Sequence, residues 1–447
     1  MGFRAASLHL LVALWLFAGG TAMAGPLTPG VHVEGIGPYS PQIRPAPTGI
    51  TAFIGRATRG PTNEPALVQS FQEFEAKFGG LRAECPMTYA LHGFFENGGR
   101  QALVIRLHRA GQPRRGSDSS IKRPEKASTP GLPLDARTLI GSREERTGLY
   151  ALEKADLFNL LCIPPDVPEG DTHPAVYQEA LRYCVERRAM LIIDPPAAWS
   201  AGMDAAGAAS AATRGIAALG LTGPETRNAV FYFPRLVISD PLAPGRALTL
   251  APSGHVAGVI ARTDAARGVW KSPAGSEATL RGVLRAEVAF TTREIELLNA
   301  AGINALRATP EGGPMIWGIR TLRSGEEAGD EYCYLPVRRT ALHVEESIRR
   351  GLQWCVYEEN AEPLWARART AVEGYLNDLW RAGAFQGSRP GHAYYVQCGR
   401  DTTTPADVER GVCIVRAGFA PLRPAEFISL RVEVMCGQVR REPPPLR

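Results

Sequence analysis

Apolar and polar residues alternate near the start of the chain, in the segment Gly30-Val-His-Val-Glu-Gly35. Val31 and Val33 alternate with His32 and Glu34, which is the period-two pattern of a β-strand with one buried face. Four prolines lie between residues 38 and 47, and each removes an amide donor, so a hairpin return strand cannot be built there. An isolated strand is not stable in water. We therefore expect this segment to pair with a distant part of its own chain or with another chain.

Residues 49–335 contain apolar runs that alternate with helical patterns. The apolar runs are continuous, which is typical of the buried strands of a parallel sheet covered by helices on both faces. We predict an α/β, doubly wound core. Strands are expected at residues 49–55, 101–106, 157–163, 190–194, 228–232 and 315–320, and helices after the capping box that begins at Ser70 and at residues 88–97, 177–188, 204–219 and 291–301. Residues 110–141 are polar and without a period, and we expect an exposed, mobile insertion.

The pattern changes at about residue 336. Helices are expected at residues 344–356 and 364–382, and strands at residues 393–398, 411–417 and 426–434. We predict a separate α+β domain over residues 336–447. Its last strand alternates apolar and polar positions, so the chain ends, as it begins, with a strand that is able to reach outward. The apolar positions of that strand are Phe427, Ile428, Leu430, Val432 and Val434.

The charge distribution argues against a nucleic-acid partner, and the cysteine spacing argues against a disulfide framework and a zinc site. The 447 residues carry a formal net charge of +5, and much of the basic excess lies between residues 109 and 126. A basic loop without aromatic residues does not make a nucleic-acid platform, so no nucleic-acid partner is expected. The eight cysteines are scattered and mostly lie in apolar runs. Their spacing favours free, buried thiols over a disulfide framework or a zinc site.

The first 24 residues allow two interpretations. Arg4, the apolar stretch 8–18 and Ala22-Met23-Ala24 have the form of a secretory leader with its cleavage site. Met23 is also a possible start, and the scattered cysteines favour this second interpretation. We expect residues 1–22 to be a hydrophobic leader, either signal-like or a misplaced start, and residues 23–48 to be an N-terminal linking arm. No other run approaches the length of a membrane span, so no membrane binding by the protein itself is expected.

A serine hydrolase is the first enzyme class to test. Asp194 follows an expected strand and His255 lies in a glycine-bearing turn, in the chain order of a subtilisin-type triad. The nucleophile is missing, because Ser276 and Ser324 lie in polar loops and no Gly-x-Ser-x-Gly elbow occurs. Phosphate-binding and zinc-binding motifs are also absent from the sequence. We expect no catalytic, cofactor or metal site, and we expect Asp194 to cap the turn before Pro195.

Seven stretches, taken in order, resemble the tail sheath proteins of contractile bacteriophages and of related injection systems. They are spread over nearly all of the chain from about residue 25 to residue 434, and the ordered series is far more specific than any single stretch. The stretches are Pro29-Gly-Val-His-Val-Glu34, Ala52-Phe-Ile-Gly-Arg56 with Gly60-Pro-Thr-Asn-Glu-Pro65, Asn97-Gly-Gly-Arg-Gln-Ala-Leu-Val104, Asp156-Leu-Phe-Asn-Leu-Leu-Cys-Ile-Pro164, Ala251-Pro-Ser-Gly-His-Val-Ala-Gly-Val259, Glu346-Ser-Ile-Arg-Arg-Gly-Leu-Gln-Trp354 and Ala420-Pro-Leu-Arg-Pro-Ala-Glu-Phe427.

The resemblance implies a subtilisin-like core without protease activity and a C-terminal domain that joins subunits by exchanging terminal arm strands. The protein would be a structural subunit that polymerises around an inner tube and contracts to drive the tube through a target envelope. The implied partners are copies of itself in helically stacked hexameric rings, the inner tube protein, and the baseplate and tail terminator proteins, after assembly in the cytoplasm. No cofactor is implied. The residues expected at subunit interfaces are Val31, Val33, Glu34, Phe427, Ile428, Leu430, Val432 and Val434. The alternative is a divergent, secreted serine hydrolase of subtilisin-like fold.

Overall fold

The computed structural model describes residues 42–109, 130–309, 313–326, 329–422 and 428–435. The chain divides into Met1–Tyr39 and Ser40–Arg447, and every described residue lies in the second unit. The predicted arm strand with Val31, Val33 and Glu34 therefore lies outside the described residues, and so does Phe427. Most of the predicted insertion, residues 110–129, lies outside them as well.

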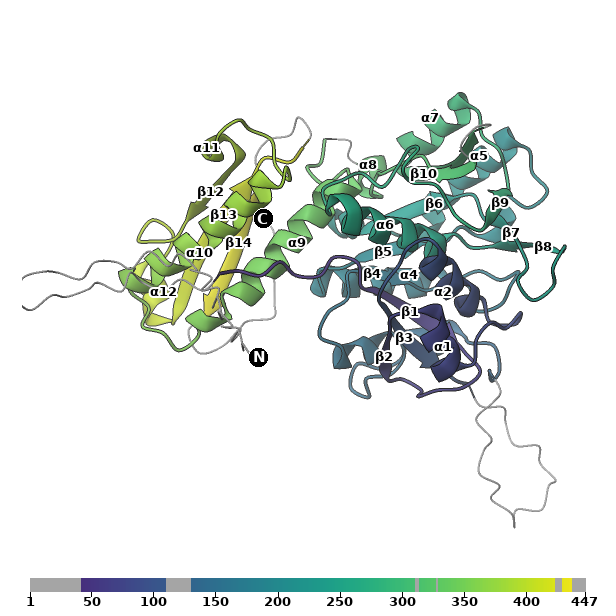
Figure 1. Ribbon diagram of the computed structural model, residues 1–447, viewed down its shortest axis with the longest axis horizontal. Helices are drawn as coiled ribbons and strands as arrows, with labels where there is room; N and C mark the ends of the chain where they lie inside the picture. The colour runs from purple at the N-terminus through teal and green to yellow at the C-terminus, as the bar shows by residue number, and fades with distance from the viewer. Residues whose placement is uncertain (1–41, 110–129, 310–312, 327–328, 423–427, 436–447) are drawn as a thin grey trace, which may run out of the picture. The chain divides into compact units, whose positions relative to one another are not determined.

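A sheet of eight strands forms the centre of the larger domain within the described residues (Figure 1). Its spatial order is β11-β10-β6-β5-β4-β1-β3-β2, and the six inner strands are parallel, while β11 and β2 run antiparallel at the two edges. The strands are β1 (Thr51–Arg56), β2 (Pro65–Val68), β3 (Ala102–Leu107), β4 (Leu160–Cys162), β5 (Met190–Ile193), β6 (Ala229–Phe233), β10 (Ile303–Thr309) and β11 (Gly313–Ile316). The predicted doubly wound sheet is confirmed; its likeness to subtilisin stays a prediction.

Helices cover both faces of this sheet because both faces of its inner strands are apolar. In β1, Ala52 and Ile54 belong to one hydrophobic cluster and Phe53 to the other, since successive side chains of a strand point to opposite faces. The first cluster is covered by α3 (Ala136–Ile140), η1 (Gly148–Lys154), α4 (Pro174–Glu186), α5 (Ala205–Gly215), η3 (Ile216–Leu219) and α7 (Thr292–Ala300). The second is covered by α1 (Phe71–Phe78), α2 (Pro86–Glu96) and α6 (Ser253–Arg267).

Most predicted helices and strands of this core are confirmed within a few residues. Ser70 caps α1 by accepting a hydrogen bond from the amide of Glu73, and Gly79 ends the helix with a left-handed backbone, φ 98°. The prediction for residues 130–141 was wrong, because α3 forms there and buries Leu139. The strands β2 and β10 were missed, and the strand expected at residues 315–320 is the shorter, antiparallel β11.

Helix α6 is the largest element that the sequence pattern misses. Its two glycines are typical of a turn, yet both are contact points between α6 and α2. A Cβ atom on Gly254 would lie 2.1 Å from the carbonyl oxygen of Ala90, and one on Gly258 would lie 2.4 Å from that of Phe94. The missing side chains therefore allow the two helices to pack backbone to backbone, and both helices are buried against the sheet.

A small antiparallel sheet and short helices complete this part of the chain. The sheet has the order β8-β7-β9. The elements are β7 (Leu236–Ser239), β8 (Ala247–Leu250), β9 (Val283–Ala286), η2 (Ala197–Trp199), η4 (Pro224–Asn228) and α8 (Arg323–Glu326).

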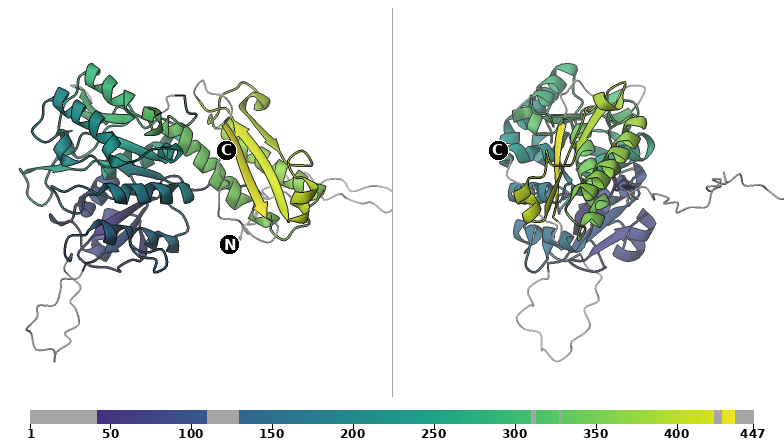
Figure 2. Two further views of the ribbon diagram at one scale, coloured as in Figure 1. Left: turned by 180° about the vertical axis from the view of Figure 1, so that it is seen from behind. Right: turned by 90° about the vertical axis from the view of Figure 1, so that its left-hand side faces the viewer.

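The smaller, C-terminal part combines helices with an antiparallel sheet, and its extent as a separate domain over residues 336–447 stays a prediction. Its three-stranded antiparallel sheet, counted over the described residues, has the order β12-β13-β14, and α10 packs against β12 and β13 while α9 packs against β14. Figure 2, left, shows the face of this sheet that is turned away from α10. The elements are α9 (Leu335–Gly351), η5 (Gln353–Cys355), α10 (Glu362–Arg381), α11 (Pro390–Ala393), β12 (Tyr394–Gln397), α12 (Pro405–Glu409), β13 (Val412–Phe419) and β14 (Ile428–Met435).

Helix α9 begins nine residues earlier than the pattern predicts. Its first two turns are buried almost all round, and even Arg338 and Arg339 are buried there. A helix buried on every side shows no apolar stripe, so periodicity gives no signal for its start.

Candidate functional site

The carboxyl ends of the parallel strands are the place where α/β proteins of this type bind ligands, at the crevice where the strand order reverses. Here the order reverses between β1 and β4. Arg56 ends β1, and its Nε donates to Asp166, in the loop after β4, at 2.8 Å. The side chains of this pair are 4% and 9% exposed. The guanidinium also donates to the carbonyl oxygens of Glu84 and Asp166. The crevice is thus filled by an internal ion pair.

The predicted candidates Asp194 and His255 lie near this edge, but their surroundings differ from the prediction. Asp194 does not cap the turn before Pro195. Its carboxylate accepts hydrogen bonds from the amide of Ser253 at 2.8 Å and from the hydroxyl of Ser253 at 2.7 Å, and so caps the N-terminus of α6. His255 does not lie in a loop turn, as expected, but in the first helical turn of α6. The sequence prediction did not include Ser253, which stands at the N-terminus of α6, and Ser324 lies in α8 rather than in a polar loop as expected.

These three residues do not form a catalytic triad in the structure. Ser253 and His255 are two positions apart on one helix, so their side chains do not face each other. The His255 ring packs on Gly93 of α2, where a Cβ would lie 2.4 Å from the ring, and its Nδ1 has no hydrogen-bond partner among the described residues. All three side chains are buried, with 3% or less exposure. Burial raises the pKa of Asp194 to about 6 despite its bonds to Ser253, and burial lowers the pKa of His255 to about 4.

The buried imidazole predicts a dependence of stability on pH. His255 stays neutral in the fold, while the unfolded chain gains a proton as the pH falls below the ordinary value of 6.5. The unfolded state then binds more protons, so stability falls between pH 6.5 and 4, by about 2 kcal/mol at pH 5. Asp194 acts in the opposite direction, because its raised pKa favours the folded state as the pH falls below 6.

The test therefore compares the pH dependence of thermal unfolding in a His255 variant with that in the unaltered protein. In His255→Leu, the midpoint of thermal unfolding should fall less between pH 7 and 5 than in the unaltered protein, by a few degrees. Equal falls in both proteins would contradict a neutral, buried His255.

A segment that precedes β1, residues 42–48, ties the C-terminal domain to the core; we call it the strap. Ile43 is buried in the hydrophobic cluster of the C-terminal domain, against Gly351 at the end of α9. The amide of Ala46 donates to the hydroxyl of Ser347 in α9 at 2.9 Å. On the core side, the carbonyl oxygen of Pro47 accepts from Asn159 at 2.8 Å. The strap is thus held by both domains.

A buried ion pair joins the same three segments. Arg339 of α9 donates to both carboxylate oxygens of Asp264 in α6, at 2.7 and 2.5 Å, and also to the carbonyl oxygen of Thr48 in the strap at 2.9 Å. The two side chains are 4% and 3% exposed. Such a bidentate pair fixes orientation as well as distance. Spacing alone gives no signal for this pair, since its members are 75 residues apart.

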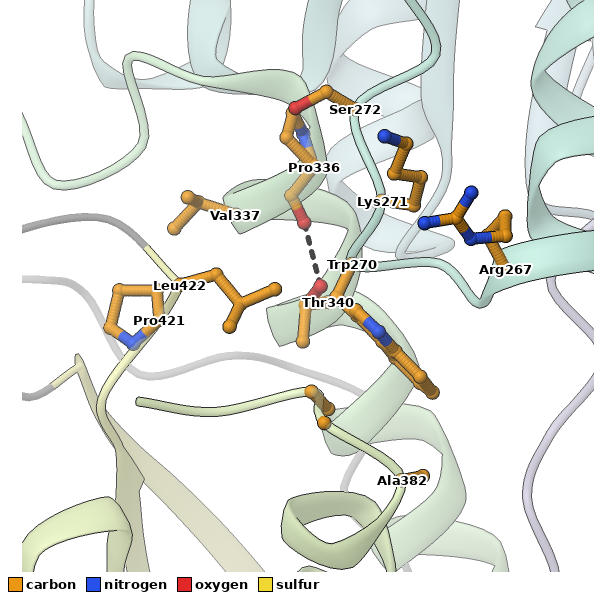
Figure 3. Close-up of a pocket in the computed structure, with 12 residues that line it drawn as sticks. Arg267, Trp270, Lys271, Ser272, Pro336, Val337, Thr340, Ala382, Pro421 and Leu422 are labelled. Carbon is orange, nitrogen blue, oxygen red and sulfur yellow. Dashed lines mark hydrogen bonds between the residues drawn. The ribbon is translucent and has the colours of Figure 1, made fainter. Parts of the chain in front are cut away.

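A cleft of about 400 Å³ lies beside this junction. Figure 3 shows Arg267, Trp270 and Lys271 on one side and Pro421 and Leu422 on another. Its two cations are already engaged, because Arg267 and Lys271 lie 2.9 and 3.6 Å from the carboxylate of Glu277. The remaining lining is apolar except for Ser272 and Thr340, and the Thr340 hydroxyl donates to the carbonyl oxygen of Pro336. The cleft therefore lacks the convergent polar groups that fix the orientation of a small ligand.

In the part of the chain that the structure describes, no cluster of three or more His, Cys, Asp or Glu side chains is arranged to hold a metal ion. No described helix is both long and apolar enough to cross a membrane.

The predicted interface residues that the structure does describe lie on one strand. Ile428, Leu430, Val432 and Val434 belong to β14, which pairs along its whole length with β13 of the same chain, from Phe419↔Ile428 to Val412↔Met435. Within the described residues β14 is the last strand of its sheet. Its other edge therefore carries main-chain groups that no described strand pairs.

Within the described residues, the geometry defines a class of protein with a doubly wound α/β core and a C-terminal antiparallel sheet that has β14 at one edge. Comparison with known proteins gives the family. Residues 147–322 match the phage tail sheath protein central domain and residues 327–435 match the phage tail sheath C-terminal domain. The chain belongs to the phage tail sheath protein family.

Individual relatives agree with this assignment. The tail sheath protein of Enterobacteria phage T4 is 24% identical over 179 residues, which are 40% of this chain and 26% of that protein. A prophage major tail sheath protein of Pseudomonas aeruginosa is 26% identical over 193 residues, 41% of this chain and 45% of that protein. The chain thus spans less than half the length of these relatives. The cryo-EM structure of the anti-feeding prophage helical sheath in its contracted state is 26% identical, with a TM-score of 0.65, over 90% of this chain and 98% of that chain.

Proposed function

We propose that this protein is the structural subunit of a contractile sheath, which polymerises around an inner tube and contracts to drive that tube through a target envelope. The observation that carries the proposal is the match to the contracted helical sheath, because it extends over nine-tenths of this chain and includes both domains. The central and C-terminal family matches support the same function.

The assembly contacts would be made by terminal arms. The edge of β14 offers a row of main-chain donors and acceptors to an added strand, and each such hydrogen bond contributes ~0.5–1.5 kcal/mol net. The segment with Val31, Val33 and Glu34 has the pattern of a strand that needs a partner. β14 is paired with β13 of its own chain, so we infer that the N-terminal segment adds to the edge of β14 in a neighbouring subunit, in hexameric rings that stack helically.

The strap anchors the N-terminal arm to the folded domains. Ile43 and Ala46 contact α9, and Arg339 of α9 donates to the strap. A force on the arm is therefore transmitted to the C-terminal domain and, through Arg339, to the core. The further partners of the proposal are the inner tube protein, a baseplate and a tail terminator. Assembly would take place in the cytoplasm, and the subtilisin-like core would have no protease activity.

Two measurements on the same purified protein separate this function from that of a serine hydrolase. In analytical ultracentrifugation, we expect large polymers whose fraction rises steeply with protein concentration. We also expect a fluorophosphonate probe to label no serine, because Ser253 is buried and hydrogen-bonded to Asp194. Stoichiometric labelling of Ser253 in a protein that stays monomeric would overturn the proposal in favour of the hydrolase.

A further inference from the structure

Two thiols meet in the core of the C-terminal domain. Cys398 directly follows β12 and Cys413 lies in β13, and their sulfur atoms are 3.8 Å apart. They are 2% and 1% exposed and belong to the same hydrophobic cluster. The seven described cysteines are all buried, as the sequence predicts, but the sequence did not predict that Cys398 and Cys413 lie together.

The backbone on both sides of this pair is held in place. Arg369 of α10 donates to the carbonyl oxygen of Cys398 at 2.7 Å. Next to Cys413, the carbonyl oxygen of Ile414 accepts from the hydroxyl of Thr402 at 2.8 Å, and the amide of Ile414 donates to the hydroxyl of Thr403 at 3.0 Å. The loop between the cysteines is therefore fastened to β13, and the two thiols stay close in the folded protein.

The remaining movement is small. A disulfide bond is roughly 2.05 Å long, so the two sulfur atoms, which are 3.8 Å apart, have to approach by less than about 2 Å. The hydrogen bond from Cys398 and burial raise the pKa of Cys413, which keeps that thiol protonated and slow to react at neutral pH.

We propose that Cys398 and Cys413 are a disulfide-forming pair that locks β12 to β13 when the protein meets an oxidant of the peroxide class. One thiol loses its proton, its thiolate attacks a peroxide oxygen, and the O–O bond breaks; the leaving hydroxide takes up the proton to give water, and the cysteine becomes a sulfenic acid. The second thiol then attacks that sulfur, the S–O bond breaks, and the hydroxyl leaves as water. In sum, two thiols and one hydrogen peroxide give one disulfide and two waters.

The disulfide acts at the edge of the C-terminal sheet that β12 forms. β12 is the outer strand opposite β14, and its pairing with β13 covers four residues, Tyr394 to Gln397. A covalent bond at the end of so short a ladder prevents it from fraying. It also closes the loop that contains α12. The inference stands on the cysteine geometry and does not depend on the proposed function.

The test is a peptide map of the full chain, purified with reductant and then treated with hydrogen peroxide at mildly alkaline pH. Arg400 and Arg410 lie between the two cysteines, so trypsin separates them unless a disulfide joins their peptides. We expect the Cys398–Cys413 peptide pair to be the main disulfide, to disappear with dithiothreitol, to be absent in Cys413→Ser and to remain in the control Cys355→Ala. The oxidised protein should unfold a few degrees higher than the reduced protein.

Three results would overturn the inference. The first is a treated, folded protein in which both thiols still react with a maleimide after denaturation. The second is a disulfide that forms only when denaturant is present during oxidation. The third is a Cys398–Cys413 bond that leaves the unfolding temperature unchanged, which would remove its role as a lock.

Discussion

Arg339→Met should destabilise the protein by about 3–5 kcal/mol, because it leaves the buried carboxylate of Asp264 without its counter-charge. The same change removes the hydrogen bond from Arg339 to Thr48, so the strap loses its contact with α9 at that point. Methionine keeps most of the side-chain volume, and the loss therefore reports the charge rather than a cavity. Urea unfolding followed by fluorescence measures the free energy of unfolding directly.

Two further variants show whether the lost stability comes from the buried ion pair. Arg267 lies on α6, as Asp264 does, and pairs with Glu277 at the surface, where the two side chains are 54% and 55% exposed. Arg267→Met breaks this pair and should lower the free energy of unfolding by less than about 1 kcal/mol. The double variant Arg339→Met with Asp264→Leu removes both charges and should recover much of the lost stability. A loss below about 1 kcal/mol for Arg339→Met, equal to that of the control, would show that the ion pair does not hold the two domains together.

Deletion of residues 23–36 should leave a folded protein that no longer polymerises. The deletion removes the predicted arm strand with Val31 and Val33, but it keeps the strap, whose anchors begin at Ile43. The fold should therefore persist, while every subunit contact loses the several main-chain hydrogen bonds of a strand. We expect the sedimenting fraction to fall at least tenfold, with an unchanged circular dichroism spectrum.

The control for this deletion tests the strand pattern itself. Val31→Ser combined with Val33→Ser changes only the apolar face of the arm and should also reduce polymer formation. His32→Ser changes the opposite face and should leave polymer formation nearly intact. Polymers of normal length in the deletion would contradict an exchange of N-terminal arms.

The sequence predicts the layout of the core because its strands are buried on both faces. Such strands appear as continuous apolar runs, and β1, β4, β5 and β6 were found from these runs alone. Helix α6 was missed for a physical reason: its glycines serve close packing against α2 rather than a turn. The start of α9 was missed because that part of the helix has no polar face.

The pairs that matter for the candidate sites follow no local spacing. Arg339 and Asp264 are 75 residues apart, and Cys398 and Cys413 are 15 residues apart without a recognised cysteine motif. Only the packing of α9 on α6 and the pairing of β12 with β13 bring them together. By contrast, the alternation in residues 427–434 does predict the strand β14, although it cannot tell which chain supplies the neighbouring strand.

Electron microscopy of the purified protein in negative stain tests the central claim most directly. The protein should form tubes built from stacked rings, and the variant that lacks residues 23–36 should show only small single particles at the same concentration. Single particles from the unaltered protein at every concentration, or tubes of normal length from the deletion variant, would contradict a sheath that is joined through exchanged arms.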